Sequence, residues 1–243
     1  MITILIVMVI GLIIYLIRSQ NKNNSGVSKS NTHKPTVLSI DTPVNFGYKC
    51  MWIAVKTNNK ERIAQVLGLK NRQPSNWQTG IAGAYNDRVF ISPQVSEWTL
   101  AVGFGLSNVD GGGHLVEEEN YKEIINKLSK EFGEAQFFAS HRVVEYHVWA
   151  KSINGKTIRY YSYVGEKGEN ILVEGEPTDV EKQYNFINTF SKEAKDKNYF
   201  ARTDLTIPDE DVVMKIAAAW SVDPTKLAGR KDVSPGLGIV GKR

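Results

Sequence analysis

The sequence has a single cysteine, Cys50, among its 243 residues. One thiol excludes an intramolecular disulfide and is consistent with a reducing compartment. Hydrophobic residues make up 42% and charged residues 23% of the chain, which is ordinary for a globular protein with a sizeable core. The length allows one domain of about 200 residues or two small domains.

The sequence also lacks a basic domain. Its formal net charge is +4, and residues 18–36 account for all of it, with Arg18, Lys22, Lys29 and Lys34 and no acids. Residues 37–243 therefore keep 26 of the 30 basic residues against 26 acidic ones. A domain that binds nucleic acid concentrates positive charge on its surface. We therefore expect no nucleic-acid partner.

Residues 2–17 (ITILIVMVIGLIIYLI) contain no charge and predict a transmembrane anchor. As a helix they would span roughly 24 Å, slightly less than the ~30 Å hydrocarbon core of a bilayer. A cleaved signal peptide is the alternative, but no Lys or Arg precedes the run and no small-residue cleavage pattern follows before Asn24. Basic residues lie only on the C-terminal side. The positive-inside rule thus predicts a single-pass membrane protein with a cytoplasmic C-terminal domain, and the opposite orientation is the alternative.

The rest of the chain divides into three parts. Residues 18–36 are rich in Asn, Ser and Lys and contain no aromatic, so they predict a flexible basic tether. Residues 37–229 are predicted to form a single globular α+β domain. Residues 230–243 contain three glycines and predict a disordered tail.

The clearest local pattern is Asn154-Gly155 between two aromatic-rich strands. This dipeptide favours a type I′ turn, which needs positive φ at both central residues. Aromatic residues on both faces of the hairpin place it centrally in a sheet. A two-residue loop predicts three cross-strand pairs, Ile153–Lys156, Trp149–Tyr160 and His147–Ser162.

Other elements follow from hydrophobic periodicity and turn residues. Helices are expected at residues 117–132, from Thr178 and from Asp209, with a short one after Asn58. Residues 71–87 are expected to be turns and residues 108–114 a mobile loop. Further strands are expected at residues 48–56, 88–92, 98–104, 135–139 and 170–174.

The predicted fold class is α+β. Its mainly antiparallel sheet would have a central Asn-Gly hairpin, would be packed by three or more helices and would be preceded by one transmembrane helix.

Three polar residues form the main candidate site. His141, Glu145 and His147 have even spacing, so one strand face could present all of them. They would supply zinc ligands or an acid/base pair. The alternative is a structural role, in which the histidine is hydrogen-bonded within the sheet beside Trp149 and Tyr160. Side chains at i and i+2 do not converge on one point without help from a neighbouring strand, which favours this alternative.

Other motifs have simpler explanations. Residues 150–157 match a relaxed phosphate-loop pattern, but the following residues favour a strand, whereas a phosphate loop opens a helix. We therefore expect no nucleotide and no other cofactor. Cys50 lacks a nearby base that would activate it as a nucleophile. Asp209, Glu210 and Asp211 are explained by the charge preference of a helix start.

Three runs of sequence resemble an uncharacterised bacterial family. They are SKEFGEAQFF-SHRVVEYHVWAK-NGK-IRYYSYVGEKGE, the upstream RVFISPQVSEWTLAVG and the downstream MKIAAAWSVDP. The resemblance implies one contiguous domain in a bacterial protein. It implies no activity and no functional residue.

We expect the protein to be a membrane-tethered binding or interaction module without enzymatic activity, with a possible protein partner. Tethering would raise the local concentration of that partner without any new contact. The alternative is a small metal-dependent or acid/base hydrolase that uses His141, Glu145 and His147.

Overall fold

The computed structural model describes residues 38–107 and 118–243. Residues 39–106 and 118–243 form one compact unit, which is described below. The predicted anchor (residues 2–17), the predicted tether and the predicted loop at residues 108–114 lie outside the described residues.

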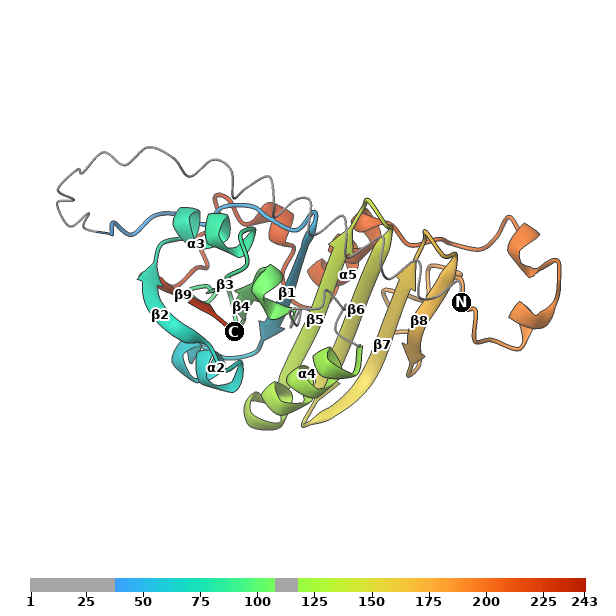
Figure 1. Ribbon diagram of the computed structural model, residues 1–243, viewed down its shortest axis with the longest axis horizontal. Coiled ribbons are helices and arrows are strands. Elements are labelled where there is room, and N and C mark those ends of the chain that lie inside the picture. Colours follow the sequence, from blue (N-terminus) through green and yellow to red (C-terminus); the bar gives the residue numbers. More distant parts are fainter. Residues whose placement is uncertain (1–37, 108–117) are drawn as a thin grey trace, which may run out of the picture. The chain divides into compact units, whose positions relative to one another are not determined.

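The compact unit is built on one antiparallel sheet, which has nine strands in the described ranges (Figure 1). The strands are β1 (Cys50–Val55), β2 (Lys70–Ser75), β3 (Val89–Ile91), β4 (Thr99–Val102), β5 (Glu134–His141), β6 (Tyr146–Ile153), β7 (Lys156–Val164), β8 (Glu169–Glu174) and β9 (Gly238–Lys242). Their order in the sheet is β2-β9-β3-β4-β1-β5-β6-β7-β8. The apolar strand β1 therefore occupies the middle.

Helices cover both faces of the sheet. The α-helices are α2 (Lys60–Val66), α3 (Trp77–Ala84), α4 (Glu118–Phe132) and α5 (Glu210–Trp220), and the short 3-10 helices are η1 (Phe104–Leu106), η2 (Glu193–Lys195), η3 (Tyr199–Ala201) and η4 (Pro224–Lys226). Tyr121 of α4 stacks on Phe137, whereas Trp220 of α5 packs on the neighbouring Phe138. Successive strand residues point to opposite faces. The helices α4 and α5 therefore lie on opposite faces (Figure 1).

A row of large apolar side chains crosses the sheet on the α5 face. Cross-strand pairing joins six of them in the order Phe90, Val102, Trp52, Phe138, Trp149 and Tyr161. Trp52 stacks on Phe138 and Trp149 on Tyr161, with ring centroids 5.1 and 4.4 Å apart. Aromatic pairs of this kind contribute about 0.5–1.5 kcal/mol beyond their area burial. The row specifies the register, because a slip of one residue would move it to the other face.

The predicted Asn-Gly turn is confirmed, but its register is not. Asn154 and Gly155 have φ of 50° and 83°. Farther along the hairpin, a register shift leaves Ile158 as an extra residue that is 41% exposed. Such a bulge moves every following side chain to the other face. The observed pairs are Ile153–Lys156 as predicted, but Trp149–Tyr161 and His147–Tyr163 in place of Trp149–Tyr160 and His147–Ser162.

The predicted fold class is wrong and is corrected here. The described ranges contain a nine-stranded antiparallel sheet with four α-helices, and none of these helices is long and apolar enough to cross a membrane. The hairpin strands β6 and β7 are not central but lie toward one end of the sheet. The reason is that β2, β9, β3 and β4 all extend the sheet on the other side of β1.

The C-terminal residues 230–243 do not form the expected disordered tail. They contribute β9, which lies between β2 and β3. Gly238 is needed there because a Cβ at this position would lie 2.4 Å from the Phe90 ring. A glycine that suggested flexibility in the sequence thus serves close packing.

Two other segments also differ from expectation. Residues 71–87, expected to be turns, contain most of β2 and all of α3, whose N-cap Asn76 accepts a hydrogen bond from the Thr79 amide. No helix begins at Thr178. The Glu181 carboxylate accepts a hydrogen bond from the Thr178 amide, as in a capping box, but the chain turns away instead of continuing.

The connecting segment (residues 175–209) leads from β8 to α5 and is held to the sheet through Glu181. This side chain is 0% exposed and forms an ion pair with Arg159 of β7, with Arg159 Nη2 2.7 Å from Glu181 Oε1. The same carboxylate accepts a hydrogen bond of 2.7 Å from Trp149 Nε1 of β6. Arg159 also donates to the carbonyls of Glu174 and Gly175. The pair therefore fixes the connecting segment against β6 and β7.

Replacing Glu181 with Gln is expected to lower the free energy of unfolding by about 3–5 kcal/mol, because the substitution leaves the Arg159 guanidinium buried without its counter-charge. Urea denaturation of the wild-type and variant proteins measures the loss. The matched control is Glu193→Gln, the same substitution at an exposed position, which should leave stability unchanged. A loss below about 1 kcal/mol for Glu181→Gln would show that the pair does not hold the segment.

Candidate functional site

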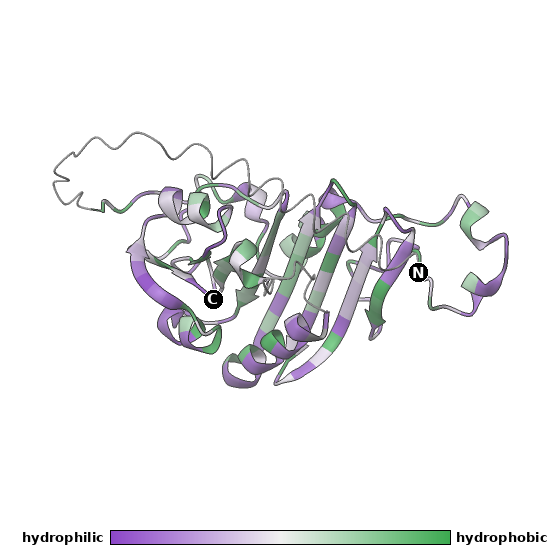
Figure 2. Ribbon diagram, viewed as in Figure 1, coloured by the Kyte–Doolittle hydropathy of each residue, from purple (hydrophilic) through white to green (hydrophobic). Residues whose placement is uncertain are grey.

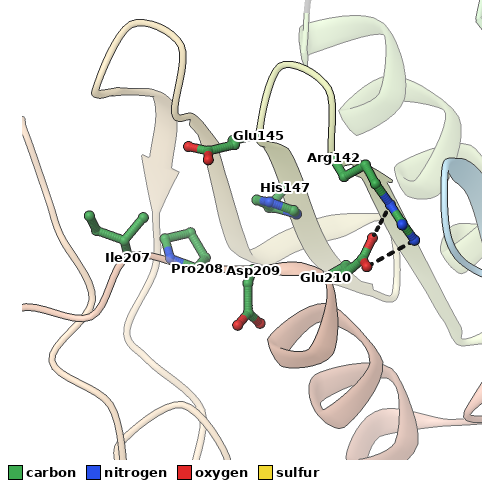
Figure 3. Close-up of a pocket in the computed structure, with 7 residues that line it drawn as sticks. All are labelled: Arg142, Glu145, His147, Ile207, Pro208, Asp209 and Glu210. Carbon is green, nitrogen blue, oxygen red and sulfur yellow. Dashed lines mark hydrogen bonds and ion pairs between the residues drawn. The ribbon is translucent and has the colours of Figure 1, made fainter.

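A pocket of about 290 Å³ opens where the β5–β6 turn meets the start of α5 (Figure 3). One wall comes from residues 142–147 and the other from residues 207–210. Its lining residues are Arg142, Glu145, His147, Ile207, Pro208, Asp209 and Glu210. Two segments far apart in sequence thus form one hollow with charged, apolar and imidazole groups.

Local structure positions the two unpaired acids of the pocket. Asp209 is the N-cap of α5, and its Oδ1 accepts a hydrogen bond of 2.8 Å from the Val212 amide. Glu145 ends the β5–β6 turn with a φ of 51°. Its side chain lies against Gly165, where an added Cβ would be 2.0 Å from Glu145 Oε2. Neither carboxylate forms an ion pair within the described part of the chain.

His147 of β6 lies between these two walls (Figure 3) and is 3% exposed. Its Nδ1 is 3.4 Å from the Ser140 hydroxyl of β5. In the described ranges no protein group forms a hydrogen bond with its Nε2. Burial lowers the pKa of His147 to about 4; the negative charge of Asp209 opposes this shift and His141 adds to it. The imidazole is therefore neutral at physiological pH.

Arg142 carries the only positive charge in the lining, and this charge is already neutralised. Its guanidinium forms an ion pair with Glu210, with N–O distances of 3.0 and 3.2 Å (Figure 3). It also lies over the Tyr48 ring, 5.6 Å from the centroid. The lining has three carboxylates against one guanidinium, so the pocket has an excess of negative charge.

The structure separates the three predicted site residues. Glu145 and His147 line the pocket, but His141 does not. His141 pairs with Tyr146, whereas the adjacent Ser140 pairs with His147, so the two histidines point to opposite faces of the sheet. The expectation of a shared face fails because a tight turn separates His141 from His147. The pairing of β5 with β6 then determines which face each side chain points to. Among the described residues, no group of three or more His, Cys, Asp or Glu side chains could hold a metal ion.

The other candidate motifs lie away from the pocket. Cys50 is buried, and burial raises the pKa of its thiol to about 12, which leaves it unreactive. Residues 150–157 lie on the hairpin strands β6 and β7, where no helix follows to hold phosphate groups. Both observations agree with the structural explanations of these motifs.

Sequence reasoning missed several pocket residues. Ile207 and Pro208 carry no chemical signal in a sequence, and Arg142 lies in a turn. Asp209 was interpreted only as a helix-start residue. A capping Asp before an apolar helix stripe predicts the start of α5. Only the long-range packing of α5 on β5 and β6 brings Asp209 to the same pocket as His147.

No family model, curated protein or solved structure matches the chain. The resemblance to an uncharacterised bacterial family therefore stays a prediction.

The lowered pKa of His147 makes stability dependent on pH. The ring is expected to titrate near pH 4 in NMR spectra, with signals identified by their loss in His147→Gln. The stabilising effect of this neutral ring is complete above the ordinary histidine pKa of about 6.5, and is lost as pH falls toward 4, because the unfolded chain binds the proton first. The loss attributable to His147 should reach about 3 kcal/mol.

Asp209→Asn provides the internal control. Asn also caps helices well, so the fold should persist while the pKa of His147 falls further, since the nearby negative charge is gone. Asp211→Asn, two residues after Asp209 in the chain, should leave the His147 titration unchanged. A His147 pKa near 6.5 in the wild-type protein would contradict the buried position.

Proposed function

We propose that this unit is a non-enzymatic binding module and that the pocket is its binding site. One observation carries the proposal: a nearly buried His147 has a ring nitrogen without a protein partner, next to two carboxylates that lack ion pairs. Pockets that bind small groups combine an apolar wall with a few such polar groups. A bound group would supply the hydrogen bond that His147 Nε2 lacks, whereas Glu145 and Asp209 are exposed and water can satisfy their carboxylates.

Several features argue against catalysis in this pocket. A covalent mechanism needs an activated nucleophile that the substrate can reach. The hydroxyl that contacts His147, that of Ser140, belongs to a residue that is 2% exposed. General base catalysis works best when the pKa is near the operating pH, and the pKa of His147 lies well below it.

The alternative remains an acid/base hydrolase, because Glu145 and His147 line the same pocket. Its original third member, His141, faces the other side of the sheet. The alternative thus depends on two residues, with only the long Ser140 contact of 3.4 Å to orient the imidazole.

Membrane attachment through residues 2–17 and a cytoplasmic location stay predictions, because those residues lie outside the described part of the chain. A protein partner also stays a prediction. The proposal for the pocket depends on none of them.

An NMR screen of a fragment library against the full-length protein tests the proposal. We expect several fragments to shift the signals of His147 and of the first turn of α5. Ile207→Trp should abolish these shifts, because Ile207 is 58% exposed at the pocket and a larger ring would fill it without disturbing the core. The matched control is Ile171→Trp on the edge strand β8, also exposed, which should leave binding intact.

The same protein is assayed with chromogenic esters and phosphate esters, with and without added zinc or magnesium. No turnover above buffer is expected. Turnover that His147→Gln removes would establish the hydrolase instead, and the absence of any fragment in the pocket would refute the binding module.

A further inference from the structure

We propose that the pocket binds an aliphatic ammonium or guanidinium group, carried either by a free amine or by a lysine or arginine side chain of a peptide. This inference rests on the proposed binding function and specifies the ligand. It depends on the charge of the lining, the free nitrogen of His147 and the apolar wall beside them.

The charge of the lining selects a cation. Glu145 and Asp209 have no counter-charge within the described residues, whereas Arg142 is engaged by both oxygens of Glu210. Hydrogen bonds between an ionised donor and a carboxylate are roughly twice as strong as neutral ones. An anionic ligand would instead meet two unpaired carboxylates and no available guanidinium.

His147 supplies a neutral acceptor. A neutral imidazole has one N–H donor and one acceptor nitrogen. When its Nδ1–H donates to the Ser140 hydroxyl, 3.4 Å away, Nε2 keeps a lone pair for a ligand N–H. Its low pKa is consistent with this role, because the ring adds no positive charge that would repel a cation.

The apolar wall fits an aliphatic stem rather than a bare ion. Ile207 is 58% exposed and precedes the buried Pro208, and both lie on one side of the pocket (Figure 3). Long cationic side chains lay their methylene stems along such surfaces while the charged head stays polar. In contrast, the described residues include no group of three acid, histidine or cysteine side chains suited to a metal ion.

Titration of the full-length protein, followed by His147 NMR shifts, tests the ligand class. The free probes are butylamine and butylguanidine, and the peptide-like probes are the N-acetyl methylamides of lysine and arginine. Butanol, butyrate and the corresponding norleucine derivative are the neutral and anionic controls. Cationic probes should bind at least about tenfold more tightly than their neutral counterparts, as expected for a charge-assisted hydrogen bond. Binding should weaken as salt is added.

Charge-removing variants locate the effect. Glu145→Gln and Asp209→Asn should each weaken binding of the cationic probes about two- to fivefold, because both carboxylates are exposed, and should leave butanol binding unchanged. Asp211→Asn, outside the lining, should bind like the wild type. Tighter binding of the lysine derivative than of butylamine would identify a peptide as the source, and the reverse would identify a free amine.

Equal binding of neutral and cationic probes, or cation binding that both pocket variants leave unchanged, would overturn the inference. Fragments of other kinds that still bind the pocket would then leave the binding module standing. A pocket that binds no probe and no fragment would refute both.

Discussion

The buried ion pair between Glu181 and Arg159 is the constraint on which the rest of this structure depends. Burying two ions away from water is costly, and further hydrogen bonds to both side chains offset this cost. Trp149 and Thr178 donate to the carboxylate, while two carbonyls accept from the guanidinium. The pair thereby holds the connecting segment on the α5 face. That segment ends at Asp209 and contributes Ile207, Pro208 and Asp209 to the pocket, so holding it against the sheet helps to place one wall of the pocket.

The sheet also needs protection at its two edges, which otherwise invite pairing with another chain. At one edge, β2 is hydrophilic (Figure 2) and contains Pro74, which cannot donate to a further strand. At the other edge, β8 carries a register shift at Ile171. Asn170 and Thr189 exchange two hydrogen bonds there, so part of the connecting segment covers the β8 edge. These features disfavour pairing of either edge with another chain, so the pocket is the better candidate for recognition.

Local patterns in the sequence predicted local structure well. The stripe of α4, the capping Asp209 of α5 and the Asn154-Gly155 turn all appear as expected, because each depends on neighbours within a few residues. Features set by long-range packing could not be predicted in this way. The Ile158 bulge changed the hairpin register, and Gly238 proved to be a packing residue of β9. Glu181 keeps its capping-box contact with Thr178 but also pairs with Arg159 of β7, and no helix follows. The pocket belongs to this second group, since only the tertiary fold brings Glu145 and Asp209 to the lining of one pocket.

Asp209 shows why the fold and the site are hard to separate. Its carboxylate accepts the hydrogen bond from the Val212 amide that starts α5. Its negative charge also opposes the lowering of the His147 pKa. A helix N-terminus interacts favourably with a negative charge, so the helix and a cationic ligand would use the same carboxylate. Asn would preserve the cap and remove the charge, whereas Glu210 is already committed to Arg142. The recognition chemistry therefore depends on an acid that also caps α5, so the start of the helix fixes where this charge lies in the pocket.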